Sequence, residues 1–340
     1  MMSRFSALPR EPEHFAIHPV LYSRRHFLRQ VLGAGALTLA GASGFSPLLG
    51  QTNTSPSPAP FRFAFLTDLH LLQAGALRSV AGISACLDAV EKLKPRPEFI
   101  LCGGDLVHST REMTLPGAET ALDFFLQLWR YHTDLPTYWT FGNHDLAGTS
   151  NHNVPTDDKE YGKGLFQNRL QLPKLFYSFD HKDWHFIVLD DIALQPDRSY
   201  TGQLFDDELT FLMADLDAHR AMPTIVCTHI PVMSNVPMGL SLAHLADPHR
   251  PAPNLKTLVC TNGDTLLDDI GPHNVRAVLA GHLHFYEQLE HNGVQIINSG
   301  AVCGSYWRGA NHGCPEGFGV VDVGADGSVK FDYRTYGWKA

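Results

Sequence analysis

The chain has 340 residues, of which 44% are apolar and 18% are charged, with 29 glycines and 22 prolines. This composition excludes a disordered, collagen-like or coiled-coil protein and supplies enough core for one large globular domain or two smaller ones. The formal net charge is −9; the first 59 residues carry +3, so the remainder carries −12. Such an acidic chain disfavours a nucleic-acid or anionic-membrane surface as its main partner. A site for an anionic ligand would therefore need a strong local cation such as a metal ion.

Residues 23–29 read Ser-Arg-Arg-His-Phe-Leu-Arg and stand directly before an apolar run, rich in glycine and alanine, over residues 31–49. They resemble the bacterial twin-arginine export signal, Ser-Arg-Arg-x-Phe-Leu-Lys, with Arg29 in place of lysine. The resemblance implies recognition by the twin-arginine export machinery, cleavage between Ala42 and Gln51, and a periplasmic or secreted bacterial protein. No stable membrane association is expected after cleavage.

An uncleaved membrane anchor is the alternative interpretation of the same run. Its 19 residues are enough to span a bilayer, although its glycines make it weakly apolar. We assign residues 1–50 to the signal and residues 51–60, rich in Ser, Thr and Pro, to a solvated linker. The folded domain is then expected over residues 61–340.

Past the linker, strand-like apolar runs alternate with helical patterns, which predicts a layered α/β fold. Strands are expected over 61–67, 99–102, 137–141, 176–179, 185–190, 224–228 and 275–280, and helices over 77–93, 118–131 and 204–219. Two late hairpins are expected to turn at 291–293 and 325–327, where Asn-Gly and Asp-Gly tolerate positive φ. Residues 230–260 are too long for a plain connector, and we expect them to form a cap that shapes a substrate pocket.

The six cysteines do not form a small-domain disulfide framework, because a chain of this length does not need one. Cys102 and Cys227 lie in strand-like runs and are expected to be buried thiols. Cys303 and Cys314 bracket a ten-residue loop, and the sequence leaves open whether they form a disulfide.

Five of the expected strands end in a polar cluster, which is where ligands bind in layered α/β folds. The clusters are Asp68-Leu69-His70, Gly104-Asp105, Gly142-Asn143-His144-Asp145, Thr228-His229 and Gly281-His282-Leu283-His284. Carboxylates, an amide oxygen and imidazoles together suit Mn, Fe or Zn. In Asp-x-His and His-x-His, an extended backbone would place both side chains on one face. Ordinary turn and capping residues are the alternative, but they would not recur at equivalent strand ends.

In this order, the five clusters resemble the motifs of the calcineurin-like metallophosphoesterase superfamily. The resemblance implies a four-layer α/β/β/α sandwich with two mixed β-sheets over residues 61–340. It also implies two divalent metal ions, with a shared hydroxide as the nucleophile toward a phosphate ester. The first ion would be held by Asp68, His70, Asp105 and His284, and the second by Asp105, Asn143, His229 and His282, so that Asp105 bridges them.

The resemblance also assigns roles to residues beside the ligands. His144 would stabilise the transferring phosphoryl oxygen or protonate the leaving group, and Asp145 would orient His144. His108 occupies the place where purple acid phosphatases carry a metal-binding tyrosine, and we expect a loop residue there that could approach the site. Arg308 is a candidate phosphate-binding residue, with Trp307 beside it as a stacking surface.

The sequence therefore predicts a metal-dependent phosphoester hydrolase that acts outside the cytoplasm on a small phosphoester. Phosphodiesters are favoured, because in this resemblance the Asp-x-His block is shared by cyclic-nucleotide and glycerophosphodiester hydrolases. A broad-specificity phosphomonoesterase, a catalytically silent metal-binding scaffold and a single-zinc hydrolase are the alternatives. The patterns carry no signal for the oligomeric state.

Overall fold

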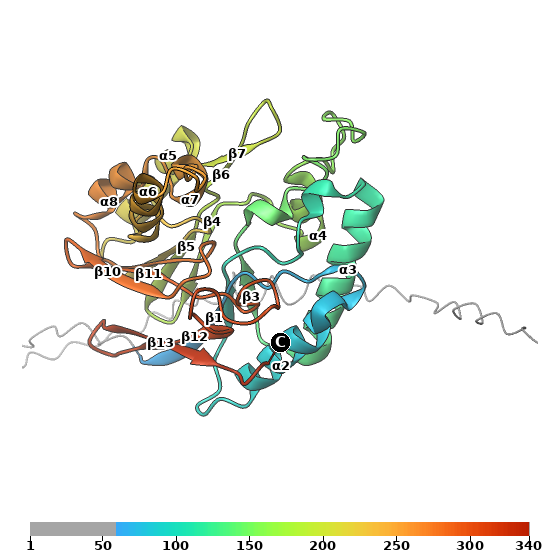
Figure 1. The fold of residues 1–340 in the computed structure, drawn as a ribbon. Helices are drawn as coiled ribbons and strands as arrows, with labels where there is room; N and C mark the ends of the chain where they lie inside the picture. Colours follow the sequence, from blue (N-terminus) through green and yellow to red (C-terminus); the bar gives the residue numbers. More distant parts are fainter. Residues whose placement is uncertain (1–58, 340) are drawn as a thin grey trace, which may run out of the picture. The chain divides into compact units, whose positions relative to one another are not determined.

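The computed structural model describes residues 59–339, so the expected export signal and nearly all of the expected linker lie outside the described residues. Two β-sheets pack face to face, and helices cover the outer face of each sheet (Figure 1). The four layers and the two mixed sheets agree with the expected fold. Within the described residues, no helix combines the length and the apolar character that a membrane crossing requires.

The first sheet has five strands in the order β13-β12-β1-β2-β3. Strands β1, β2 and β3 run parallel, so their carboxyl ends lie at one edge of the sheet, whereas β12 pairs antiparallel with β1 and with β13. The strands are β1 (Phe61–Leu66), β2 (Ile100–Cys102), β3 (Thr137–Trp139), β12 (Gly317–Val323) and β13 (Val329–Thr335).

The second sheet has six strands in the order β10-β11-β9-β8-β5-β4. Its four inner strands run parallel, and β4 and β10 close the edges in antiparallel orientation. The strands are β4 (Tyr177–His181), β5 (Trp184–Val188), β8 (Thr224–Cys227), β9 (Val275–Ala280), β10 (Glu287–His291) and β11 (Val294–Asn298). A separate hairpin of β6 (Ile192–Leu194) and β7 (Tyr200–Gly202) was not anticipated from the sequence.

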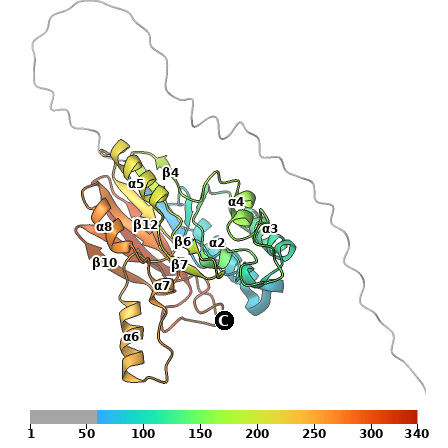
Figure 2. The ribbon, with the colours of Figure 1, turned by 90° about the horizontal axis from the view of Figure 1, so that it is seen from above.

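Most of the helices lie near the outer faces of the two sheets, and α6 (Val236–Ala246) projects from the body of the protein. They are α2 (Ser79–Glu91), α3 (Leu115–His132), α4 (Gly164–Leu170), α5 (Asp206–Ala218), α6 (Val236–Ala246), α7 (Leu255–Leu258) and α8 (Gly263–Ile270), with short 3₁₀ helices at Gln73–Arg78, Thr110–Glu112 and Asn143–Asp145. Helices α2 and α3 pack on the first sheet, and α5 and α8 pack on the second. Helix α6 extends away from the body of the protein (Figure 2).

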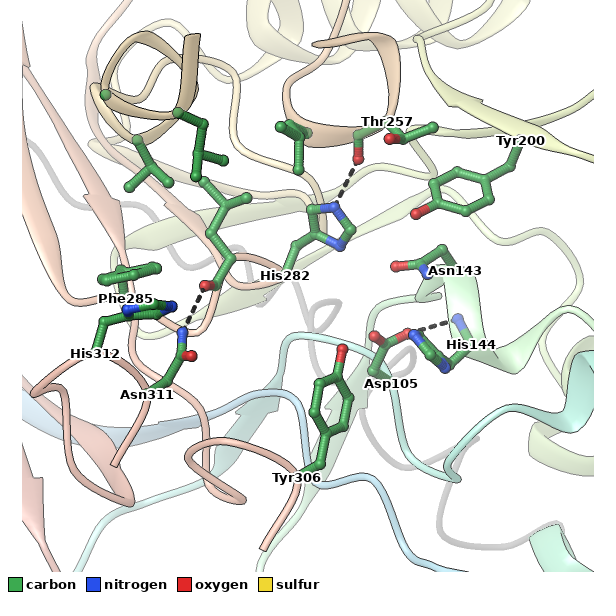
Figure 3. A pocket seen from close by; sticks show the side chains of 15 residues that line it. Asp105, Asn143, His144, Tyr200, Thr257, His282, Phe285, Tyr306, Asn311 and His312 are labelled. Atoms are coloured by element: carbon green, nitrogen blue, oxygen red, sulfur yellow. Dashed lines mark hydrogen bonds between the residues drawn. The ribbon is translucent and has the colours of Figure 1, made fainter. Parts of the chain in front are cut away.

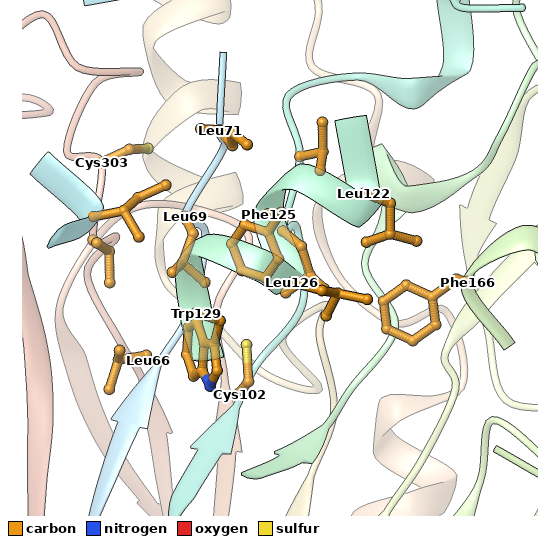
Figure 4. Packing of buried hydrophobic residues seen from close by; sticks show 14 of the residues in the cluster. Leu66, Leu69, Leu71, Cys102, Leu122, Phe125, Leu126, Trp129, Phe166 and Cys303 are labelled. Atoms are coloured by element: carbon orange, nitrogen blue, oxygen red, sulfur yellow. The ribbon is translucent and has the colours of Figure 1, made fainter. Parts of the chain in front are cut away.

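The side chains of β1 point alternately into two hydrophobic cores, one on each face of the first sheet. Phe63 and Phe65 point between the sheets, where Phe63 stacks on Phe99 with ring centroids 4.9 Å apart. Ala64 and Leu66 belong to the core on the other face, under α2 and α3; Figure 4 shows Leu66 in this core. This period of two follows from the pleated strand. It holds β1 buried on both faces, so the loop after β1 leaves a rigid element.

The cysteines are free thiols in the structure, and Cys303 and Cys314 do not form a disulfide. Cys102 and Cys227 are fully buried, as expected. Burial raises the pKa of the Cys227 thiol to about 12, so it remains protonated and packs as a small apolar side chain.

Candidate metal centre and active site

The expected metal ligands meet at one edge of the two sheets, just beyond the carboxyl ends of five parallel strands. The first sheet contributes Asp68 and His70 after β1, Asp105 after β2 and Asn143 after β3. The second sheet contributes His229 after β8, and His282 and His284 after β9. All seven side chains come together although they span 217 positions of the chain.

One ligand group surrounds Asp68 and His70. The Asp68 Oδ1 atom lies 3.3 Å from His284 Nε2, and the two imidazole Nε2 atoms of His70 and His284 lie 3.2 Å apart. Asp105 Oδ2 completes this group at 3.4 Å from His70 Nε2. A carboxylate pair with two imidazoles at these separations can converge on one ion.

A second ligand group lies on the other side of the same Asp105 oxygen. His229 Nε2 is 3.3 Å from Asp105 Oδ2 and 3.0 Å from Asn143 Oδ1. His282 belongs to this group, because its ligating atom falls within 4.8 Å of those of Asp105 and His229. The two groups therefore share Asp105, which is the arrangement that a bridging carboxylate requires.

The backbone at the ligands is turned rather than extended, which corrects the expectation of a strand-like Asp-x-His. Asp68 and His70 have φ of 55° and 42°, and His282 and His284 have φ of 70° and 56°. These left-handed values are uncommon for residues other than glycine and cluster at functional sites. Tight turns, not strand pleats, bring the i and i+2 side chains to one place.

Backbone carbonyls hold three of the imidazoles in a fixed orientation. His229 Nδ1 lies 2.7 Å from the Gly103 carbonyl, His284 Nδ1 lies 2.6 Å from the Gly304 carbonyl, and His282 Nε2 lies 2.7 Å from the Thr257 carbonyl. In each case the ring N–H donates to the carbonyl, so the opposite nitrogen is the one that could bind a metal ion. Metal-ligating histidines are characteristically held in this way.

The chemistry of the buried donor groups fits divalent cations. Among the described residues, Asp68 Oδ1, the carboxylate oxygen that faces His284, is a buried polar atom without a hydrogen-bond partner. Although burial acts in the opposite direction, the charge of His229 holds the pKa of Asp105 well below its usual range. Two ionised carboxylates in a buried site require positive charge beside them. The residues present would hold two divalent ions with Asp105 between them.

His144 stands beside this centre and faces a cavity of about 560 Å³ (Figure 3). Its backbone N–H donates to Asp105 Oδ1 at 2.8 Å, and its ring meets His70 edge-on at 4.7 Å and stacks on His108 at 5.4 Å. Burial lowers the pKa of His144 to about 3, so the imidazole is neutral. His108 is thus part of the same imidazole cluster, and burial also lowers its pKa.

Asp145 does not contact the His144 ring, which differs from the expected orienting role. Its carboxylate accepts hydrogen bonds from the backbone N–H groups of Asp105 at 2.9 Å, Leu106 at 3.0 Å and Gly142 at 3.1 Å. Among the described residues, His144 Nδ1 has no hydrogen-bond partner. Asp145 therefore ties the loop after β2 to the loop after β3 and positions Asp105.

The loop after Cys303 also differs from expectation. Trp307 is only 1% exposed, and its indole N–H donates to the His70 carbonyl at 2.9 Å, so it is a buried brace and not a stacking surface. Arg308 is exposed and is not among the residues that line the cavity. Tyr306 lines the cavity instead, with its ring 4.8 Å from that of His70. The sequence pointed to Trp307 and Arg308, but it does not show which residue of this loop is buried and which one lines the cavity.

Asp191 is a site residue whose role the sequence did not indicate. Its carboxylate accepts hydrogen bonds from the backbone N–H groups of His229 at 3.2 Å and Ile230 at 3.0 Å. Burial raises the pKa of Asp191 to about 7. The available signal in the sequence is the Asp190-Asp191 pair at the end of the strand expected over 185–190, which by itself does not distinguish a site residue from a local cap.

Comparison with known proteins agrees with this geometry. Residues 61–286 match the family described as calcineurin-like phosphoesterase. This match covers more than half of the chain, so the protein belongs to that family. The family uses dinuclear divalent metal centres, and the shared Asp105 is the feature of this chain that such a centre needs.

Curated relatives and solved structures are similar over most of the chain. A 3′,5′-cyclic-nucleotide phosphodiesterase of Nostoc is 26% identical over 281 residues, which cover 79% of this chain and 90% of the relative. The 3′,5′-cyclic adenosine monophosphate phosphodiesterase CpdA of Haemophilus influenzae is 21% identical, with coverage of 79% and 88%. A dimetal phosphatase from Danio rerio has the same fold with a TM-score of 0.53 at 14% identity, covering 81% of this chain and 99% of that one. The protein is a metal-dependent phosphoester hydrolase.

Proposed function

We propose that this enzyme hydrolyses phosphodiesters in preference to phosphomonoesters, with Mn, Fe or Zn as the two ions. The observation that carries the proposal is the charge of the cavity: no arginine or lysine is among its lining residues, all of which the structure describes. A phosphomonoester is a dianion near neutral pH and gains from a cationic side chain, whereas a diester carries a single charge. The phosphodiesterase names of the relatives support the same preference.

The chain's own residues fit distinct steps of such a hydrolysis. Two bound ions would supply an activated water as the nucleophile and would offset the charge of the phosphate. Asp105 joins the two ligand groups, and the phosphate would bind beside it. A neutral His144 is suited to donate a ring N–H to a phosphoryl oxygen; to protonate the leaving group, the negative charge of the substrate would first have to raise its pKa.

Turnover of bis-(p-nitrophenyl) phosphate and p-nitrophenyl phosphate by metal-loaded enzyme tests the preference. We expect kcat/KM for the diester to exceed that for the monoester by about tenfold or more, and we expect measurable turnover of 3′,5′-cyclic AMP. Equal or faster monoester turnover would instead favour a broad phosphomonoesterase. A sample with two ions per chain that is inert toward all three compounds would favour a scaffold, and one ion per chain would favour a single-zinc hydrolase.

We also propose that the enzyme works outside the cytoplasm, in the periplasm or after secretion. The support is the Arg-Arg motif at Arg24 and Arg25, which lies outside the described residues. Replacing both arginines by lysine keeps the charge but removes the motif. Cell fractionation of the bacterium is expected to find wild type in the periplasm or medium and the variant retained in the cytoplasm; identical distributions would contradict export by this route.

A further inference from the structure

One wall of the active-site cavity is apolar. Its side chains come from α6, α7 and the loop after β9, and they are Val236, Leu240, Leu258, Leu283 and Phe285. Figure 3 shows Phe285 across the cavity from Asp105 and His144. The cavity thus has a polar side at the candidate metal centre and, at a distance from it, a mostly apolar side that Asn311 and His312 adjoin (Figure 3).

Helix α6 presents two different apolar faces. Val236, Gly239 and Leu240 stand at helical positions i, i+3 and i+4 and line the cavity. The outer face carries Met238, Leu242 and Leu245, which are 60%, 58% and 74% exposed and line no part of the cavity. The helix contains no Asp, Glu, Lys or Arg. The cavity face can therefore be altered separately from the outer face.

Leu240 leaves a large apolar surface exposed on the cavity face of α6. It lines the cavity and is 45% exposed. Leaving apolar surface in water is unfavourable, and apolar pocket walls ordinarily bind apolar parts of a ligand. A charged group at the α6 part of this wall would lose water without gaining a partner of opposite charge, because none of the described lining residues from the cap is charged.

We propose that the substrate is a phosphodiester whose retained ester group, the one that stays on phosphorus, is an alkyl chain or an aromatic ring bound against α6. This inference rests on the proposed phosphodiesterase function. With the phosphate at the metal centre and the leaving oxygen on the side of His144, the second ester group points toward the apolar wall. Covering about 100 Å² of apolar surface raises affinity by roughly 10- to 100-fold.

A series of alkyl p-nitrophenyl phosphates tests the proposal on the full chain loaded with metal. Water cleaves the P–O bond to p-nitrophenol, and the alkyl phosphate is the second product, so the retained group alone varies from methyl to butyl to octyl. We expect kcat/KM to rise about tenfold or more along the series, mainly through a lower KM. The concentrations stay below those at which the octyl ester forms micelles.

Three variants of α6 locate the effect. Leu240→Ser is expected to remove most of the gain with chain length, and Leu240→Phe to retain it, because phenylalanine keeps the apolar surface. Leu245→Ser makes the same change on the outer face of the same helix and is expected to behave as wild type. Circular dichroism and thermal unfolding establish that each variant is folded.

Two results would overturn the inference. Equal kcat/KM for the methyl and octyl esters in wild type would show that the wall does not bind the retained group, while the phosphodiesterase proposal would stand on the turnover itself. An equal loss in the two serine variants would show that the gain with alkyl-chain length does not depend on the cavity face of α6. No turnover of any diester would count against the proposed function instead.

Discussion

Asp105 occupies the place on which both ligand groups depend, because one of its oxygens lies within 3.4 Å of an imidazole from each group. Asp105→Asn removes the negative charge and is expected to reduce bound metal from two ions per chain to less than one. Asn143→Ala takes a ligand from the second group only and is expected to retain the first ion. Elemental analysis of the two variants measures this difference, and equal loss in both would contradict a shared carboxylate.

His144 touches the cavity but belongs to neither ligand group, so its removal separates turnover from metal binding. We expect His144→Ala to lower kcat by about 100-fold or more at unchanged metal content. His152→Ala is the matched control, because this nearby histidine is exposed and lines no part of the cavity. An unchanged kcat for His144→Ala at full metal occupancy would show that His144 has no catalytic role.

Glu208, which is not part of the metal centre, makes the free energy of unfolding depend on pH. It is 2% exposed and accepts a hydrogen bond from the Asp190 backbone N–H, and burial together with the Asp190 charge raises its pKa from 4.5 to about 9. Between these two pH values the Glu208 carboxyl is protonated in the folded state and ionised in the unfolded chain. Stability therefore falls as pH rises between about 4.5 and 9, by at most about 1.4 kcal/mol per pH unit.

Glu208→Gln keeps the acceptor oxygen and removes the titration. Between pH 6 and pH 8 the variant is expected to gain about 1 kcal/mol or more relative to wild type in its free energy of unfolding. Urea unfolding at both pH values, with the metal concentration held constant, measures the difference. A parallel pH response of the two proteins would show that Glu208 ionises normally in the folded state.

The sequence was sufficient to identify the seven candidate ligands, because strand ends and motif order both belong to the chain itself. It was not sufficient for Asp145, Trp307 or Asp191, whose partners come from other elements. A carboxylate that accepts from three backbone N–H groups looks the same in sequence as one that orients an imidazole. These contacts depend on how loops stack, which local patterns do not encode.

At the scale of elements, α2 is fitted closely to the loop that carries Tyr306. A Cβ added to Gly82 would stand 2.0 Å from the Trp307 ring, and that ring also donates to the His70 carbonyl. Gly82→Ala is therefore expected to destabilise the fold by about 1–3 kcal/mol. Gly239→Ala in α6 meets nothing within 4 Å and is expected to be neutral or to stabilise by up to about 1 kcal/mol. Thermal unfolding compares the two substitutions, and destabilisation of similar size would contradict the packing argument.

The expected elements agree best with the structure where the hydrophobic pattern extends over many residues. Helix α3 spans 115–132 where 118–131 was expected, and β9 covers the expected 275–280. The β6–β7 hairpin escaped notice because each strand has three residues, too few to show a period of two. The expected cap over 230–260 contains α6 and α7, and residues from both line the cavity.

At the scale of the whole molecule, the ligands come from both sheets, so bound ions would link the two halves of the sandwich. Removing metal with a chelator is expected to abolish turnover and to lower the melting temperature by roughly 5–10 °C, since ions at about 1,000 times their Kd add about 4 kcal/mol. Differential scanning calorimetry with and without chelator measures the shift. Restored activity and melting temperature after metal is added back would exclude irreversible damage, and an unchanged melting temperature would contradict the link.

The hydrogen bond from His282 to the Thr257 carbonyl joins the two tasks of the enzyme in one short stretch of chain. Thr257 also borders the cavity, so the segment that shapes the substrate pocket holds a candidate metal ligand in place. Exchanging residues 231–260 for a foreign sequence to obtain a new specificity would therefore also put metal loading at risk. A successful transplant must retain a main-chain acceptor at position 257, whatever side chains surround it.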